Sequence, residues 1–490
     1  MPEYKKILVT GATGYVGGRL ISRLLEKGYP VRALGRSVAK LKNRPWSDHP
    51  GVELAAGDVL DYESLLAAAQ DCNDAFYLVH SMLPGQKDFE ATDRKAALNM
   101  RQATEEARVK RLIYLGGLGE ASSTLSRHLK SRTEVGEILS AGKVPVTILR
   151  AGMILGSGSA SFEILRYLVD RLPVMITPRW VQTLCQPIAI RNVIGYLAGC
   201  LENPETQGKT FDIGGPEILT YRKLMEIYAE EAGLKKRLII GVPVLTPRLS
   251  SYWIDLVTPV PASIARPLAE GLRNPVVCRD NSIRQLIPQE LLDARQAIRL
   301  ALAATRQNEI KTHWTDAGPL PQAEALYSGD PSWAGGTLLK DARAVEVRSE
   351  KKRLWQIIVS IGGTSGWYHA DWLWKLRGFL DRMFGGAGLR RGRKDQTRLK
   401  PGDALDFWRV LSVRDEDHLL LLAEMKLPGT ATLEFKLIST PHGTQQLTQT
   451  AQFSPKGLWG ILYWYLLLPF HHYVFSGMAK QIAKKAESLA

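Results

Sequence analysis

The sequence contains few cysteines and no paired cysteine motif. Its four cysteines, Cys72, Cys185, Cys200 and Cys278, are scattered, and none has CxxC spacing. This pattern argues against a disulfide framework and against a cysteine-ligated zinc site, so we expect no metal. The chain also begins without a long apolar run and cleavage site, which predicts no signal peptide and a cytoplasmic location.

The sequence also lacks low-complexity tracts and nucleic-acid-binding motifs. Its composition, 45% hydrophobic and 23% charged residues, is that of a folded protein. A length of 490 residues exceeds one ordinary domain. The formal net charge of +15 can attract anionic ligands, lipids or nucleic acid. Because no recognisable nucleic-acid module accompanies this charge, we expect no nucleic-acid partner.

Residues 5–150 alternate between short strand-like runs and amphipathic helical segments. This alternation predicts βαβ units and a parallel sheet covered on both faces, which is a doubly wound α/β Rossmann fold. The expected strands are Lys5–Thr10, Val31–Gly35, Val52–Ala56, Ala75–Val79, Arg111–Leu115 and Val144–Leu149. The expected helices are Gly17–Lys27, Tyr62–Ala69, Ala91–Arg108 and Arg132–Ser140.

The remaining chain divides at residues 305–336, a polar segment with Gly and Pro that we interpret as a linker. Residues 1–304 would form the first domain, with its core in 4–150 and a substrate-side segment in 151–304. Residues 337–490 predict an α+β domain in which a curved antiparallel sheet grips a long C-terminal helix. Its expected strands are Leu338–Val347, Leu405–Val413, Leu419–Met425, Thr432–Ser439 and Gln445–Phe453, and its expected helices are Lys351–Ile361, His369–Phe384 and Gly457–Ser488.

The most specific motif is the glycine-rich segment Thr10–Gly17, which follows the first expected strand and opens the first helix. Here Gly11 would permit a tight turn, Gly14 a close approach of the backbone to a pyrophosphate, and Gly17 close packing of helix on sheet. The free N–H groups at the helix N-terminus would hold the phosphates of a dinucleotide. The expected cofactor-binding residues of this loop are Gly11, Thr13, Gly14, Tyr15, Val16 and Gly17.

A basic residue follows the second expected strand, where NAD-selective sites usually carry an acid that binds the ribose. This residue, Arg36, could pair with a 2′-phosphate, so the sequence favours NADP(H) over NAD(H). Asp58 and Val59 follow the third strand, where Asp58 could reach the adenine. We also place Val79 and His80, at the end of the fourth strand, beside the cofactor.

With two later segments, Gln186–Ile188 and Phe211–Pro216, these residues make roughly 4–300 resemble an atypical short-chain dehydrogenase/reductase. The subgroup is the NmrA-like one, which also includes the NADPH-binding accessory subunit of respiratory complex I. The C-terminal part resembles a domain of unknown function, often fused to such reductases, with a START/polyketide-cyclase-like (helix-grip) fold. The segments that carry this second resemblance are Gly366–Tyr368, Leu376–Gly378, Gly388–Arg393 and Tyr463–Phe470. The resemblance implies a nicotinamide-dependent enzyme joined to a domain that encloses an apolar ligand.

The catalytic residues of that family are missing from their usual positions. The family uses a Ser or Thr at the end of the fifth strand, a Tyr acid/base and a Lys four residues later. Here the strand ends in glycines, and His128 and Arg132 stand at the Tyr and Lys positions. In one interpretation His128 donates a proton, Arg132 holds the ribose, and Lys130 is a second candidate acid. In the other, the chemistry has been lost and the dinucleotide is a structural or sensing ligand.

Two functional hypotheses therefore stand. The first is an NADP(H)-dependent oxidoreductase acting on a small apolar carbonyl or quinone-like compound, and the second is a non-catalytic NADP(H)-binding sensor or assembly protein. The apolar stretch in 457–488 is short for a membrane span and is interrupted by Pro469, so we interpret it as the gripped helix. Peripheral membrane contact through 457–488, or through the Pro-rich and aromatic segment 241–275, is the alternative.

Overall fold

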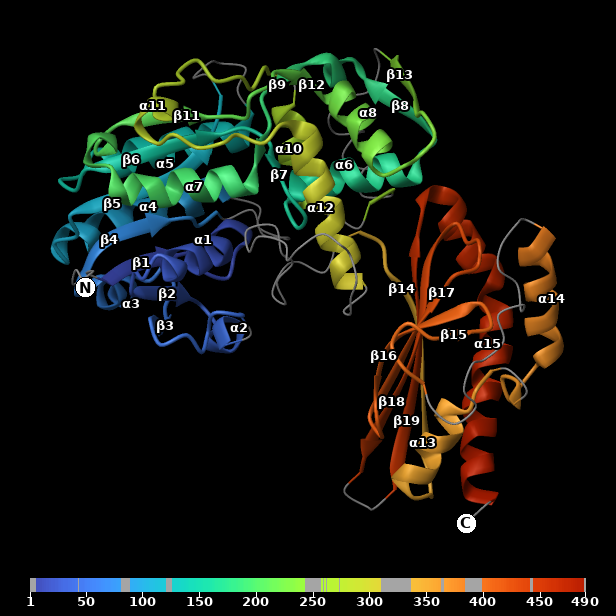
Figure 1. The fold of residues 1–490 in the computed structure, drawn as a ribbon. Helices are drawn as coiled ribbons and strands as arrows, with labels where there is room; N and C mark the ends of the chain where they lie inside the picture. The colour runs from blue at the N-terminus through green and yellow to red at the C-terminus, as the bar shows by residue number, and fades with distance from the viewer. Residues whose placement is uncertain are drawn as a thin grey trace. The chain divides into compact units, whose positions relative to one another are not determined.

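The computed structural model describes residues 6–42, 44–80, 89–119, 126–242, 257–258, 260, 262–272, 274–309, 336–362, 365–383, 399–440 and 444–488. The chain divides into two compact units, one that includes residues 6–306 and one that includes residues 337–488 (Figure 1). Of the expected linker, residues up to Glu309 belong to helix α12 (Ala294–Glu309) and 310–335 lie outside the described residues.

The first unit is built on a seven-stranded sheet with the order β11-β6-β5-β4-β1-β2-β3, in which neighbouring strands pair in parallel (Figure 1). The strands are β1 (Lys6–Thr10), β2 (Val31–Gly35), β3 (Val52–Ala56), β4 (Cys72–Tyr77), β5 (Arg111–Gly117), β6 (Val146–Ala151) and β11 (Thr210–Ile213). The chain order reverses between β1 and β4. In open α/β sheets the carboxyl ends of the strands at such a switch point form the ligand-binding crevice. The doubly wound prediction is thus confirmed for this unit, and β11 extends the expected sheet.

Helices cover both faces of this sheet because each carries one apolar stripe. Residues of α1 and α7 share one core cluster, and residues of α3, α4 and α5 share another. Their bounds are α1 (Tyr15–Glu26), α3 (Tyr62–Ala69), α4 (Phe89–Glu106), α5 (Arg127–Ser140) and α7 (Ile190–Glu202). α5 begins before the expected Arg132, because the Ser126 hydroxyl accepts the N–H of Leu129 and caps the helix. This earlier start puts His128 on the helix.

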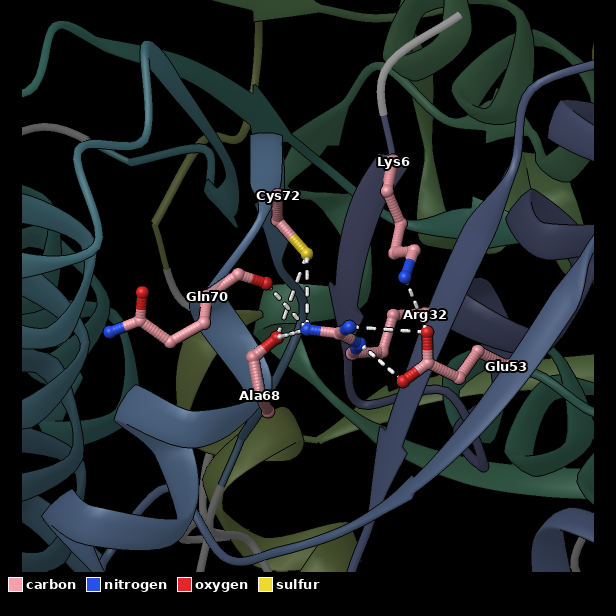
Figure 2. Close-up of polar contacts among 6 residues, drawn as sticks. All are labelled: Lys6, Arg32, Glu53, Ala68, Gln70 and Cys72. Carbon is pink, nitrogen blue, oxygen red and sulfur yellow. Dashed lines mark hydrogen bonds and ion pairs between the residues drawn. The ribbon is translucent and has the colours of Figure 1, made fainter.

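A buried arginine joins the strands to a helix end at the amino-terminal edge of the sheet (Figure 2). Arg32 on β2 donates to the carbonyl oxygens of Ala68 (2.9 Å) and Gln70 (2.6 Å) at the end of α3. Its Nε lies 2.8 Å from Glu53 Oε1 on β3, and Lys6 of β1 binds the same carboxylate at 2.6 Å. Helix C-termini carry unpaired carbonyls and partial negative charge, so a cation stabilises this helix end.

Part of the first unit forms a smaller lobe with its own apolar core. It contains α6 (Ala160–Arg171), α8 (Tyr221–Glu231), α10 (Ala262–Gly271), α12 and the short strands β7 (Ile154–Leu155), β8 (Val174–Pro178), β9 (Leu184–Cys185), β10 (Ile188–Ala189), β12 (Leu219–Thr220) and β13 (Leu238–Val242). This lobe follows β6, so it lies on the carboxyl side of the large sheet.

The second unit is a six-stranded antiparallel sheet with the order β14-β19-β18-β17-β16-β15. Its elements are β14 (Leu339–Val347), α13 (Lys351–Val359), α14 (Asp371–Met383), β15 (Ala404–Leu405), β16 (Trp408–Arg414), β17 (His418–Ala423), β18 (Gly429–Ser439), β19 (Gln445–Pro455) and α15 (Gly457–Ser488). The long helix α15 packs on β14 and β19. An antiparallel sheet with a long C-terminal helix is therefore present, whereas the START-like assignment stays a prediction.

Candidate functional site

The glycine-rich loop has a geometry that requires glycine at two positions. Gly11 has φ +73°, and a Cβ there would lie 2.6 Å from the carbonyl oxygen of Leu78. A Cβ on Gly17 would lie 2.3 Å from the carbonyl oxygen of Gly11. The N–H of Gly14 donates to that same oxygen at 2.8 Å and closes the turn. Helix α1 therefore packs directly on the turn, as the sequence predicts for a phosphate-binding loop.

The N-terminus of α1 is suited to bind phosphate. Gly14 is the N-cap residue and is exposed, and it offers no side chain that would cover the first turn. The backbone N–H groups and partial positive charge of a helix start attract anions. Thr13, Tyr15 and Val16 lie at this end of the helix and are half-buried. The ring of Tyr15 contacts the guanidinium of Arg19, whose carbon lies 4.1 Å from the ring centroid.

Two arginines follow β2, and one of them contacts the glycine-rich loop. Arg36 comes directly after the strand and is exposed. Arg44 is 3% exposed, and its Nη2 donates to the carbonyl oxygen of Thr13 in the loop. The indole of Trp46 fixes the same segment by donating to Gly18 at 2.9 Å. Arg44 thus adds a buried positive charge beside the loop. No sequence pattern indicates this role, because basic residues are common in surface segments.

Asp58 and Val59 lie at the carboxyl end of β3, as expected. The Asp58 carboxylate accepts the N–H of Leu60 at 3.0 Å, and its own N–H donates to Ser64 Oγ at 3.1 Å. Val59 is buried, and its carbonyl oxygen accepts a hydrogen bond from Asn99 at 2.9 Å. Asp58 therefore shapes the turn after β3 and leaves its carboxylate half-buried at the cofactor edge.

The carboxylate of Asp93 on α4 is buried and lies close to side chains from two other segments near the carboxyl end of β4. β4 ends at Tyr77, so Val79 and His80 follow the strand instead of belonging to it. His80 Nδ1 lies 3.3 Å from Asp93 Oδ2 on α4, which is an ion-pair distance without good hydrogen-bond geometry. Ser131 of α5 donates to the same oxygen at 3.0 Å. Neither Asp93 nor Ser131 was expected from the sequence.

His128 and Arg132 lie one turn apart on α5 and line a common cavity. The ring of His128 contacts that of His80, with centroids 4.8 Å apart. Tyr114 of β5 donates to the carbonyl oxygen of Arg132 at 3.1 Å and so fixes this turn of the helix. Lys130 is exposed and does not line the cavity.

The two histidines have perturbed acidities with a common cause. Burial lowers the pKa of His80 to about 4, and the positive charge of Arg132 adds to the effect, although Asp93 opposes it. Burial also lowers the pKa of His128 well below its ordinary value of 6.5, and His80 and Arg132 act in the same direction. Both imidazoles are therefore neutral near pH 7, and each keeps one N–H to donate.

The cavity has a volume of about 270 Å³ and joins the large sheet to the smaller lobe. Val16 of α1 and the glycines at the end of β5 form its floor, and residues of α6, α8 and α10 form its wall. Most of this lining is apolar. The polar side chains that line it belong to His128, Arg132, Ser161 and Tyr221. An apolar compound with one polar group matches such a surface.

The segments Gln186–Ile188 and Phe211–Pro216 support the cavity wall near Val276. Gln186 donates to the carbonyl oxygen of Gly215 at 2.7 Å and accepts the N–H of Cys278 at 3.0 Å. The N–H of Gly215 donates to Pro187 at 2.9 Å. The N–H of Gln186 donates to Val276, which lines the cavity. These residues hold the wall in place and do not themselves enter the cavity.

Two other features concern metals and membranes. In the described ranges no group of three or more His, Cys, Asp or Glu side chains is arranged to hold a metal ion. Within those ranges, too, no helix combines the length and apolar character needed to cross a bilayer. About half of segment 241–275, including residues 243–256, lies outside the described residues, and Ala262–Gly271 of that segment forms helix α10.

Two family models match the chain. Residues 11–166 match the model described as NAD(P)H-binding, and residues 333–478 match a protein family of unknown function, DUF2867. The second match carries no statement about fold or ligand, so it leaves the START-like resemblance of the C-terminal unit a prediction.

Known proteins are similar to the first unit. Cinnamoyl-CoA reductase 2 of Arabidopsis thaliana is 30% identical over 119 residues, which is 24% of this chain and 36% of the relative. The chloroplastic divinyl chlorophyllide a 8-vinyl-reductase of Oryza sativa subsp. indica is 25% identical over 272 residues, or 53% of this chain and 66% of the relative. The chain thus spans less than two thirds of either one.

Solved structures give the same fold. Triphenylmethane reductase of Citrobacter sp. superposes with a TM-score of 0.50 and 20% identity, and the match covers 61% of this chain and 99% of that one. Combined with the sheet order and the loop geometry, these matches identify the first unit as an NAD(P)-binding Rossmann domain with the fold of the atypical short-chain dehydrogenases/reductases.

Proposed function

We propose that the protein is an NADP(H)-dependent oxidoreductase that acts on a small apolar carbonyl or quinone-like compound in the cavity of its first unit. The observation that carries this proposal is the position of His128 and Arg132. They line an otherwise mostly apolar cavity that also contacts Val16 of the cofactor-binding helix. A dinucleotide and an apolar substrate could therefore meet there. Similarity to two proteins named as reductases supports a redox reaction.

The chain's residues fit a dinucleotide with a 2′-phosphate. The turn at Gly11 and the start of α1 form the anion site, and the cations of Arg36 and Arg44 follow β2. Arginine binds phosphate oxygens strongly through paired N–H donors. When bound, the cofactor would supply or accept the hydride at the substrate carbon.

His128 and Arg132 would act on the substrate oxygen. His128 Nδ1 and Arg132 Nε are both buried and make no hydrogen bond within the described part of the chain. A neutral imidazole donates an N–H to a carbonyl oxygen, and the fixed guanidinium charge stabilises the negative charge that develops there on reduction. The substrate oxygen would finally take the N–H proton of His128, while the other ring nitrogen takes a proton that comes from solvent, so that the imidazole ends neutral.

Asp93 and His80 would position His128. The Asp93 carboxylate is held by Ser131 and lies beside His80, whose ring packs on that of His128. This contact would limit the orientations that the imidazole of His128 can take. Lys130 has no part in this arrangement because it points to solvent.

The test is the oxidation of NADPH by the purified full chain in the presence of apolar aldehydes, ketones and quinones, with mass spectrometry of the product. We expect turnover with at least one of these classes. Turnover with none of them, in a protein that binds NADPH, would contradict the proposal.

A second candidate function is a non-catalytic NADP(H)-dependent sensor or assembly protein. The observation that favours it is the end of β5, where Gly116 and Gly117 stand in place of a hydroxyl side chain. NADPH binding without turnover, together with NADPH-dependent protection of the α10 region from proteolysis, would support this function. Turnover that is lost on replacing His128 would exclude it.

A further inference from the structure

The second unit carries an exposed apolar face on two neighbouring helices. α14 and α15 lie side by side, and the rings of Trp374 and Phe475 approach to 6.3 Å between centroids (Figure 1). More than half of the exposed large apolar side chains in the described ranges lie on these two helices. The most exposed, at 57% to 74%, are Trp372, Phe379 and Met383 of α14 and Trp459, Tyr465 and Leu466 of α15. A contiguous apolar surface of this kind marks a place of contact with lipid or with another molecule.

The apolar face is followed along α15 by positive charge. One stripe of the helix consists of exposed apolar residues spaced three or four apart: Trp459, Leu462, Leu466, Phe470 and Tyr473. Two turns further on, the same stripe carries the exposed Lys480 and Lys484. Between Gly457 and Ala479 the sequence contains no Asp, Glu, Lys or Arg. The stripe is thus apolar in its first part and cationic at its end.

The charge around the apolar face is mainly positive. Residues 337–490 contain 23 Lys and Arg against 14 Asp and Glu, and Lys375 is exposed among the apolar side chains of α14. The acids of the two helices are Asp371, Asp381 and Glu487, and each accepts a backbone N–H at 2.7 to 2.9 Å. Such bonds offset part of the negative charge of a carboxylate. The face is therefore complementary to an anionic surface.

A bilayer that contains anionic lipids has the chemistry that this face requires. Trp and Tyr side chains favour the boundary between headgroups and acyl chains, aliphatic side chains favour the acyl chains, and Lys side chains attract anionic headgroups. A protein partner usually forms about one hydrogen bond per 100–200 Å² of interface, whereas the stripe from Trp459 to Tyr473 offers few polar groups. The other side of α15 packs on β14 and β19, so this helix can meet a bilayer only along its exposed side.

We propose that the exposed apolar face of α14 and α15 docks on the surface of a bilayer that contains anionic lipids. α15 lies in the plane of the interface, with Trp459 and Leu466 among the acyl chains and Lys480 and Lys484 at the headgroups. The contacts of α15 with β14 and β19 remain in place, so docking requires no unfolding of the second unit. This docking is independent of the redox function proposed for the first unit, so either can fail without the other.

The test is flotation of the purified full chain with two kinds of vesicle, one of phosphatidylcholine alone and one of phosphatidylcholine and phosphatidylglycerol in equal parts. We expect the chain to float with the mixed vesicles, to bind the phosphatidylcholine vesicles more weakly, and to lose this preference at high salt. No binding to the mixed vesicles would overturn the proposal, and equal binding to both kinds would overturn the anionic partner.

Matched variants locate the docking surface. Replacing Trp459 and Leu466 together with Ser removes two side chains that are 74% and 73% exposed, and it should weaken binding to the mixed vesicles at least about 10-fold. Replacing Ile176 and Leu238 of the first unit with Ser, at 58% and 57% exposed, is the control and should leave binding unchanged. Thermal unfolding shows that each variant is folded. Wild-type binding by the Trp459→Ser, Leu466→Ser variant would overturn the proposal.

The lysines and the alternative partner need two further measurements. Lys480→Gln with Lys484→Gln should weaken binding to the mixed vesicles by about 30-fold and leave binding to phosphatidylcholine unchanged. Sedimentation velocity without lipid tests whether a second copy covers the face. Self-association that is lost in the Trp459→Ser, Leu466→Ser variant, without vesicle binding by the wild-type chain, would overturn the proposal in favour of an interface between copies.

Discussion

The imidazole rings of His80 and His128 lie 4.8 Å apart, centroid to centroid, although one follows β4 and the other belongs to α5. Asp93 lies behind the first ring and a mostly apolar cavity contacts the second. This arrangement makes His128 a half-buried, neutral group that lines the same cavity as Val16 of the glycine-rich loop.

Replacement of His128 should reduce turnover strongly. His128→Gln keeps an N–H donor but cannot pass a proton, so we expect kcat to fall by about 10²- to 10⁴-fold with NADPH affinity unchanged. Steady-state kinetics with the best substrate of the panel measures this. Lys130→Gln, two residues away and exposed, is the control and should keep wild-type kcat. If the two variants behave alike, His128 does not take part in the reaction.

His80 should make stability depend on pH. The unfolded chain binds a proton at His80 below about pH 6.5, whereas burial lowers its pKa in the folded chain to about 4. The free energy of unfolding should therefore be greatest above pH 6.5 and decrease as the pH falls from 6.5 to about 4. The difference between these pKa values corresponds to about 3 kcal/mol. Urea unfolding at several pH values measures the slope.

Two variants test whether His80 causes this pH dependence of the free energy of unfolding. His80→Gln should make the pH dependence less steep, with a remainder from His128, whose pKa is also lowered by burial. His49→Gln, at an exposed position, should leave the pH dependence as in the wild type. An unchanged slope in His80→Gln would mean that another group titrates in this range.

Gly17→Ala should damage the dinucleotide site. Its Cβ would lie 2.3 Å from the carbonyl oxygen of Gly11, so the turn and helix α1 must separate. Crowding of this kind costs about 1–3 kcal/mol, which corresponds to about 5- to 150-fold in NADPH affinity if the turn opens. Gly241→Ala is the control, because a Cβ at Gly241 meets nothing within 4 Å. Unchanged NADPH affinity in Gly17→Ala would show that the turn is not the phosphate site.

Arg32→Met should lower stability without changing cofactor binding. It removes the donor to the carbonyl oxygens of Ala68 and Gln70, which should cost about 1–3 kcal/mol in the free energy of unfolding (Figure 2). NADPH affinity should not change, because these contacts lie at the edge of the sheet opposite the glycine loop. Arg23→Met breaks an exposed ion pair with Glu26 and should cost less than about 0.5 kcal/mol. A large loss of NADPH affinity in Arg32→Met would contradict this separation.

Much of the fold could be predicted because the signals are local. Period-two and period-3.6 patterns, and a glycine loop between a strand and a helix, predicted the parallel sheet, and α15 was predicted with the bounds it has, Gly457–Ser488. The start of α5 could not be predicted, because the residues before Arg132 are mostly polar and show no apolar helical period. β11, a short strand paired only with β6, gave too weak a pattern.

The site was predictable only in part because its contacts are long-range. His128 and Arg132 could be found by counting along a helix, and the structure brings both to one cavity. Asp93 and Arg44 could not, since no spacing in the sequence indicates that Asp93 approaches His80 or that Arg44 reaches Thr13. Lys130 was expected at the site but does not belong to it. His128 and Arg132 line the cavity, whereas the helical period turns Lys130 between them to solvent. Membrane contact through 457–488 stays a prediction.

The most direct test of the central claim is a calorimetric titration of the full chain with NADPH and with NADH, repeated with Arg36→Ala. The account predicts one NADPH per chain, bound more tightly than NADH, and a loss of about 10- to 150-fold for NADPH alone in Arg36→Ala. Equal small losses for both cofactors would show that Arg36 does not contact the 2′-phosphate. No binding of either cofactor by the wild-type chain would contradict the account.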